Sequence, residues 1–229
     1  MSVIHAKNFT DEAAQLIAQH AEKAIEASGS FRLGLSGGNT PRAIYAKLAE
    51  SYADLPWDKV IFTFGDDRQV PKDDPMSNYR MANESLFSKV AASEENVLRY
   101  RTELGHEAAA NDYEERLRKI AAERGEAIYR HDLLLLGMGG DGHTASLFPG
   151  SPVLQEKQRW IGLQHMAPAP VTERITFTYP LINAARNICI MVGEAAKSAV
   201  VDEVMEGEPR HPTSFVRPTD GEVIWFLGY

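Results

Sequence analysis

The chain has 229 residues, 44% of them hydrophobic, and its 24 Lys+Arg against 32 Asp+Glu give a formal net charge of −8. A chain of this length buries enough apolar surface to fold without disulfides or a structural metal, so we expect a single domain over residues 1–229. The acidic balance argues against a general nucleic-acid binder, although a few local cations can still bind a small anion.

The only cysteine and the first residues bear on the compartment. Cys189 lies in the apolar run Ile188–Val192, which predicts a small buried side chain and allows no internal disulfide, as is usual in a reducing cytosol. The opening MSVIHAKNFT lacks the basic and apolar regions of a signal peptide, and no run reaches the roughly 18 apolar residues of a membrane span. We expect a cytoplasmic protein with no membrane partner.

Short apolar or β-branched runs alternate with longer helical patterns along the chain. An apolar stripe predicts a helix over Thr10–Ser28, closed by Gly29, and further helices are expected after Pro41, over Met81–Val90 and over Glu107–Glu123. The predicted strands are Phe31–Ser36, Lys59–Gly65, Asp132–Gly137, Trp160–Gln164, Arg174–Tyr179, Asn187–Val192 and Glu222–Leu227. This alternation predicts an α/β fold whose mainly parallel sheet is flanked by helices on both faces.

Ligands of such sheets bind at the carboxyl ends of the strands, and three strand ends are unusual here. The first is the loop Ser36–Thr40, where Thr40 is predicted to cap a helix that Pro41 begins. Its paired glycines beside a helix start predict an anion-binding loop, the alternative being a plain tight turn. Residues Gly34–Gly38 also match G-x-S-x-G, the nucleophile elbow of serine hydrolases, but the predicted helix begins too far beyond Ser36 for that turn.

The second strand end carries Asp66, Asp67 and Arg68 directly after a buried strand. Two adjacent carboxylates and a guanidinium at this place indicate either polar chemistry or an ordinary acidic turn with one ion pair.

The third strand end is the glycine-rich run after Asp132–Leu136, and it contains the best general-base candidate, His143, which Asp141 could orient. A helix-capping histidine is the plain alternative. The run also satisfies G-x-G-x-x-G, but Pro149-Gly150 stops any following helix within two turns, and no acidic residue near position 162 is placed to bind a ribose. The seven histidines lack the spacing of metal ligands, so no metal is expected.

Three segments in this order carry a resemblance to a known family: SGGNTP from Ser36, DDRQVP from Asp66 with SNY from Ser77, and LLLLGMGGDGHTASLFPG from Leu133. Over nearly its whole length the chain resembles the 6-phosphogluconolactonases, which belong to the glucosamine/galactosamine-6-phosphate isomerase superfamily. One departure is Asp67, because the family usually reads Asp-Glu-Arg at this place.

The resemblance implies a Rossmann-like sheet and the hydrolysis of 6-phospho-D-glucono-1,5-lactone to 6-phospho-D-gluconate in the pentose phosphate pathway, without cofactor or metal. It makes His143 the base and places Asp66 and Arg68 beside the lactone. Asp141 keeps the orienting role suggested by its place beside His143. The residues then expected to bind the substrate and its phosphate are Ser36, Gly37, Gly38, Asn39, Thr40, Gly139, Gly140, Arg174 and Lys197. The expected partner is a phosphorylated sugar lactone, and the protein is expected to be a monomer or homodimer.

Two other functions are weighed against this one. An amino-sugar-phosphate deaminase-isomerase shares the fold and the phosphate loop, but that family reads Asp-Glu-Tyr where Arg68 closes the triplet here. A non-catalytic sugar-phosphate sensor is disfavoured because no helix-turn-helix pattern precedes Phe31 and because His143 is present.

Overall fold

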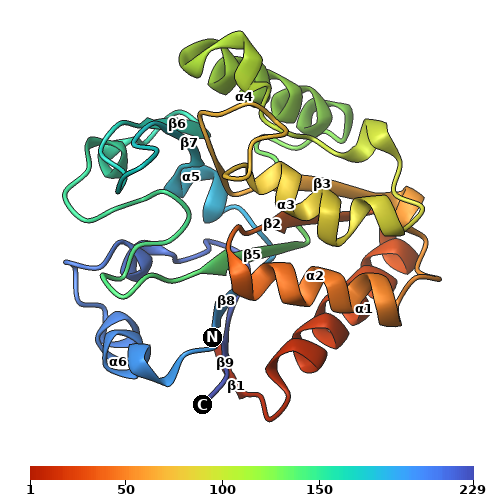
Figure 1. Cartoon of the computed structure of the whole chain (residues 1–229), viewed down its shortest axis with the longest axis horizontal. Helices are drawn as coiled ribbons and strands as arrows, with labels where there is room; N and C mark the ends of the chain where they lie inside the picture. The colour runs from red at the N-terminus through yellow and green to blue at the C-terminus, as the bar shows by residue number, and fades with distance from the viewer.

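A six-stranded sheet forms the centre of the computed structural model, which describes all residues from Met1 to Tyr229 (Figure 1). Its strand order is β1-β9-β8-β5-β2-β3, and every neighbouring pair is parallel. The strands are β1 (Ser2–His5), β2 (Phe31–Leu35), β3 (Val60–Phe64), β5 (Leu133–Gly137), β8 (Asn187–Val192) and β9 (Glu222–Leu227). The parallel sheet is confirmed, whereas β1 was not predicted because it is a mostly exposed edge strand without an apolar run.

A second, antiparallel sheet of three strands has the order β4-β7-β6. It consists of β4 (Asp66–Arg68), β6 (Ile161–Gln164) and β7 (Arg174–Phe177). Two of these strands were predicted as part of one sheet. Their separate antiparallel pairing depends on β4, a three-residue strand of polar side chains that carries no apolar signal.

Helices lie on both faces of the parallel sheet, as predicted. In Figure 1, α1 and α2 lie to its right and α5 and α6 to its left, while α4 packs on the antiparallel sheet. The helices are α1 (Phe9–Ser28), α2 (Asn39–Ser51), α3 (Asn78–Ser85), α4 (His106–Glu123), α5 (Tyr179–Ile182) and α6 (Ser198–Glu206). Short 3₁₀ turns are η1 (Trp57–Lys59), η2 (Phe87–Lys89), η3 (Glu94–Asn96), η4 (Thr102–Leu104), η5 (Pro152–Gln155), η6 (Ala195–Lys197) and η7 (Pro212–Phe215). None of the helices is long and apolar enough to cross a membrane.

Two helix starts differ from the prediction. Thr40 does not cap α2: the helix already begins at Asn39, because Gly38, with a φ of 106°, turns the chain one residue earlier and occupies the N-cap position. Helix α3 begins at Asn78 rather than Met81, because the Ser77 side chain accepts a hydrogen bond from the backbone N–H of Arg80 and caps the helix there.

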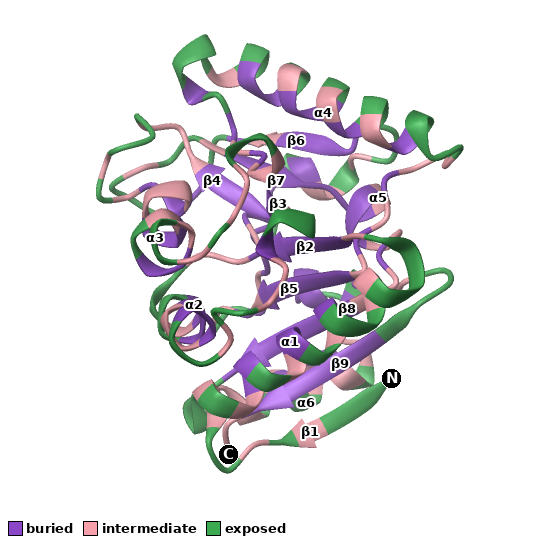
Figure 2. Cartoon of the chain, turned by 90° about the vertical axis from the view of Figure 1, so that its right-hand side faces the viewer, coloured by how far each residue is buried: buried purple, intermediate pink, exposed green.

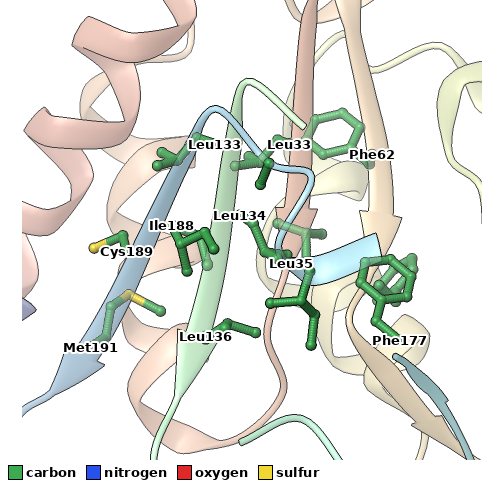
Figure 3. Packing of buried hydrophobic residues seen from close by; sticks show 14 of the residues in the cluster. Leu33, Leu35, Phe62, Leu133, Leu134, Leu136, Phe177, Ile188, Cys189 and Met191 are labelled. Carbon is green, nitrogen blue, oxygen red and sulfur yellow. The ribbon is translucent and has the colours of Figure 1, made fainter. Parts of the chain in front are cut away.

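The core is one cluster of 54 buried residues that includes strands of both sheets. Leu33 and Leu35 of β2 pack beside Leu134 of β5 and near Phe177 of β7, as Figure 3 shows. The central strands are buried on both faces (Figure 2), which explains their continuous apolar sequences. Cys189 is buried as predicted, and burial raises the pKa of its thiol to about 12.

The strand order fixes where a ligand can bind. From β2 the chain moves to β3 on one side, whereas β5, β8 and β9 follow on the other side. The order therefore reverses between β2 and β5, and the loops that leave their carboxyl ends must separate and open a crevice there. These are the loops that begin at Ser36 and after Gly137.

Candidate active site

A cavity of about 340 Å³ lies at this crevice. The predicted site residues that line it are Ser36, Gly37, Gly38, Asn39, Thr40, Asp66, Arg68, Gly139, His143, Arg174 and Lys197. Asp141 and Gly140 do not line it, although both lie in the same loop as His143. Further lining residues to which the sequence assigned no role include Asn78, Met191 and Glu194.

The glycine loop after β2 is held by the buried side chain of Tyr45. Its hydroxyl donates to the Ser36 carbonyl and accepts from the Ser36 N–H, both at 2.9 Å. A side chain at Gly37 would collide with Asn78, whose Oδ1 would lie 2.1 Å from the added Cβ, so this glycine is required for close approach. The N–H groups of Gly37 and Gly38 make no hydrogen bond within the protein and lie at the positive end of α2.

Asp67 is buried behind the cavity rather than in it. Its carboxylate accepts hydrogen bonds from the N–H groups of Arg68 (2.8 Å), Asn78 (2.7 Å) and Tyr79 (3.2 Å), and from the Ser77 hydroxyl (3.3 Å). Burial raises the pKa of Asp67 to about 6 in spite of these donors. The side chain therefore joins β4 to the start of α3.

Asn78 connects Asp66 and Arg68, the residues on either side of Asp67. Its amide nitrogen donates to the Asp66 carbonyl (2.9 Å), and its oxygen accepts from Nη1 of Arg68 (3.1 Å). The same Arg68 nitrogen donates to the carbonyl of Met76 at 2.6 Å, and the Ser146 hydroxyl donates to Asp66 Oδ2 at 2.6 Å. Hydrogen bonds from neighbouring residues thus fix the Asp66 and Arg68 side chains, which both line the cavity.

The structure brings His143 and Asp141 into direct contact. Ring atom Nδ1 of His143 lies 2.5 Å from Oδ1 of Asp141, which also accepts the backbone N–H of His143 at 3.1 Å. Burial raises the pKa of Asp141, but the hydrogen bonds from His143 outweigh it and the pKa is lowered. Because an ionised carboxylate only accepts, Nδ1 carries the proton in the neutral ring and Nε2 keeps the free lone pair.

Close packing explains two glycines of this loop, Gly139 and Gly142. An added Cβ at Gly139 would meet the His143 ring at 2.2 Å, and one at Gly142, whose φ is 76°, would meet His211 at 2.3 Å. His211 Nδ1 also lies 3.0 Å from the Asp141 carbonyl, and Thr213 donates its N–H and its hydroxyl to the Gly142 carbonyl. His211 and Thr213 thus anchor the loop from outside the cavity, and nothing in the sequence marked them.

Two further cations line the cavity from separate segments. Arg174 begins β7 and lies over the ring of Phe148 at 5.5 Å; burial lowers its pKa, with Asp66 opposing the shift. Lys197 ends the turn η6 and pairs with Glu194 at 3.1 Å. With Arg68, the lining has three permanent cations against two carboxylates, a local positive excess in a chain of net charge −8.

Comparison with known proteins places the chain among sugar-phosphate enzymes. The family model described as glucosamine-6-phosphate isomerases/6-phosphogluconolactonase matches residues 5–225. The chain is 37% identical to 6-phosphogluconolactonase of Synechocystis sp., over 98% of this chain and 93% of that one, and 37% identical to the human 6-phosphogluconolactonase, over 93% and 84%.

Solved structures agree. The crystal structure of 6-phosphogluconolactonase from Thermotoga maritima superposes with a TM-score of 0.88 at 30% identity, over 100% of this chain and 99% of that one. A monomeric glucosamine-6-phosphate deaminase superposes with a TM-score of 0.78 at 20% identity, over 98% and 97% of the two chains, which shows a shared fold.

Proposed function

Because the chain belongs to the family of glucosamine-6-phosphate isomerases and 6-phosphogluconolactonases, we propose that it hydrolyses 6-phospho-D-glucono-1,5-lactone to 6-phospho-D-gluconate. The observation that carries the proposal is the contact between His143 and Asp141 at the edge of a cavity rich in cations. A deaminase-isomerase would use the same fold, but the relatives at 37% identity are lactonases, and Arg68 stands where that enzyme family has Tyr.

In the proposed reaction, His143 acts as the general base. Asp141 holds the proton on Nδ1, so Nε2 accepts a proton from a water molecule as the water oxygen attacks the lactone carbonyl carbon. The tetrahedral intermediate then collapses, the bond from the carbonyl carbon to the ring oxygen breaks, and the imidazolium returns its proton to that oxygen. The balance is one lactone plus one water giving one hydroxy acid, with no metal or cofactor in the step.

Charge that develops on the carbonyl oxygen needs a fixed donor. Arg68 is the side-chain candidate, because Met76 and Asn78 already fix its guanidinium in place before the substrate binds. The backbone candidate is the N–H group of Gly140, because that of Gly139 already donates to the His143 carbonyl. Asp66, fixed by the Ser146 hydroxyl, is assigned to binding the sugar hydroxyls beside the lactone carbonyl.

The phosphate group is bound away from the lactone carbonyl and orients the sugar ring. We assign it to the N–H groups at the start of α2, within the loop Ser36–Thr40, together with Arg174 and Lys197. Binding energy gained at the phosphate can then hold the distant carbonyl in position for attack, and this lowers the barrier as well as the dissociation constant.

Two assays on the purified chain test the function. We expect hydrolysis of 6-phosphogluconolactone above the spontaneous rate, measured as acid release with the enzyme-free rate subtracted, and no ammonia release from glucosamine 6-phosphate. Ammonia release without lactone hydrolysis would establish the deaminase reaction instead. Binding of sugar phosphates with neither reaction would establish the sensor.

A further inference from the structure

A cluster of two histidines and a glutamate lies outside the cavity, where α4 meets the antiparallel sheet (Figure 1). One ligand atom from each of His106, His165 and Glu173 lies within 4.8 Å of the others. The two imidazole rings meet edge to face with centroids 4.9 Å apart, and His165 Nδ1 lies 3.8 Å from Glu173 Oε1. The histidines are 59 residues apart in the sequence, so linear spacing gave no hint of a metal site here.

The backbone holds all three residues in place. The last register pair of β6 and β7 is Gln164 with Arg174, and the antiparallel register therefore puts the next residues, His165 and Glu173, opposite each other. His106 is the first residue of α4, and its Nε2 lies 2.9 Å from the Arg174 carbonyl. The cluster is thus built from three segments that the fold itself fixes.

The hydrogen bond of His106 prepares the ring for a metal. A carbonyl oxygen only accepts, so Nε2 carries the proton and the lone pair of the neutral ring is on Nδ1. Metal-ligating histidines usually have this arrangement, in which the second ring nitrogen donates to a carbonyl or carboxylate and fixes the tautomer. Among all the histidines of the chain, this one combines such a bond with a second imidazole and a carboxylate close by.

The donor set selects the kind of ion. Two neutral imidazoles and one carboxylate suit Zn²⁺ and similar transition metals, whereas Mg²⁺ and Ca²⁺ prefer oxygen ligands alone. Tetrahedral bonds of roughly 2.0–2.2 Å bring ligand atoms to roughly 3.4 Å from one another, so side-chain movements of about 1 Å close the site. The His165 and Glu173 side chains are 59% and 55% exposed, which gives an ion access and leaves the fourth position to water.

We propose that His106, His165 and Glu173 bind one divalent transition-metal ion at a site separate from the cavity. The site adjoins a residue of the cavity, because Glu173 directly precedes Arg174, which lines the cavity and whose carbonyl is the hydrogen-bond partner of His106. It supplies no group to lactone hydrolysis, so metal binding is measured independently of the reaction proposed above.

The test is calorimetric titration of ZnCl₂ into the metal-stripped full-length chain. We expect one ion per chain, and we expect His106→Ala, His165→Ala and Glu173→Gln each to weaken binding at least about tenfold. His20→Ala on α1 is the matched control and should bind like the wild type. Co²⁺ should give visible absorption bands of a four-coordinate site in the wild type that are lost in the three variants, and excess Mg²⁺ should not compete.

Zinc binding at His143 in the cavity must be distinguished from binding at the cluster of His106, His165 and Glu173. The same titration in His143→Ala should still show one ion at unchanged affinity, with circular dichroism used to confirm that every variant is folded. The proposal is overturned if the folded wild type binds no Zn²⁺ at about 100-micromolar concentration. It is equally overturned if binding survives all three cluster substitutions, or disappears in His143→Ala.

Discussion

Replacing Asp67 by Asn isolates the titration of one buried carboxyl. Burial raises the pKa of Asp67 from 3.8 to about 6, which corresponds to about 3 kcal/mol. The carboxyl has a pKa of 3.8 in the unfolded chain and of about 6 in the folded protein, so between pH 3.8 and about 6 the folded protein holds the proton more often. This group therefore makes the free energy of unfolding fall as pH rises. This decrease in the free energy of unfolding is complete above about pH 6 to 7. Asp67→Asn does not show it, because the amide side chain does not titrate.

The measured quantity is the difference in free energy of unfolding between wild type and Asp67→Asn, from urea denaturation at several pH values. Between about pH 4.5 and about pH 7.5 the wild type should lose about 2 kcal/mol relative to the variant. Asp67→Glu, the usual family residue, is the control because it keeps a titrating carboxyl and should retain a pH-dependent difference from Asp67→Asn.

Two results would refute this reasoning. A difference that stays constant with pH means that the carboxyl titrates alike in both states. A difference that rises with pH means that the four hydrogen-bond donors around Asp67 outweigh its burial and depress its pKa.

The remaining predictions concern catalysis. His143→Ala should lower kcat by about 10²–10⁴-fold with little change in KM, because a general base acts in the transition state. Near-normal turnover of the folded variant would show that His143 is not the base. Arg174→Ala and Lys197→Ala should raise KM for the phosphorylated lactone by about tenfold to 10²-fold, yet leave hydrolysis of unphosphorylated gluconolactone unchanged; equal effects on both substrates would place the phosphate elsewhere. His211→Ala should lower kcat by up to about 10²-fold at unchanged KM through the misplaced loop, and His211→Asn, which can still donate to the Asp141 carbonyl, should restore part of it; a variant that loses only stability would refute this role.

The parallel sheet and the strand ends were predictable because local sequence encodes them. Strands such as β5 are apolar throughout and lead directly into glycines, so both the buried strand and the loop that follows it are visible in the sequence. The antiparallel sheet was not predictable, because three-residue β4 pairs with β7 across more than one hundred residues and has polar side chains.

In the candidate site, too, some residues were predictable from the sequence and others were not. The residues of the three loops were found by motif and by family resemblance, and the structure places most of them around one cavity. His211 and Thr213 hold the loop of His143 from 70 and 71 residues further along the chain. Asn78 lies only 10 to 12 residues from Arg68 and Asp66, in a motif that the sequence marked but to which it assigned no role. Only the packing of the fold shows that they contact the site.

Ser36 decides between two mechanisms, because it lies in the G-x-S-x-G match. A nucleophile elbow needs the serine at a sharp turn from strand into helix, with a base in contact. In the structure α2 begins only at Asn39, and the Ser36 hydroxyl makes no hydrogen bond to His143 or to any other base. Its backbone, by contrast, is fixed on both sides by the hydroxyl of Tyr45.

Ser36→Ala keeps both bonds to Tyr45, since these involve only the backbone of residue 36. The substitution removes at most one hydroxyl bond, which is worth about 0.5–1.5 kcal/mol, or up to about 3 kcal/mol to a charged phosphate oxygen. We therefore expect at most about a hundredfold loss of activity, chiefly in KM, and no acyl-enzyme in intact-mass spectra recorded during turnover. An adduct trapped on Ser36, or complete inactivation of the folded variant, would show that serine attacks the lactone and that His143 activates a hydroxyl rather than water.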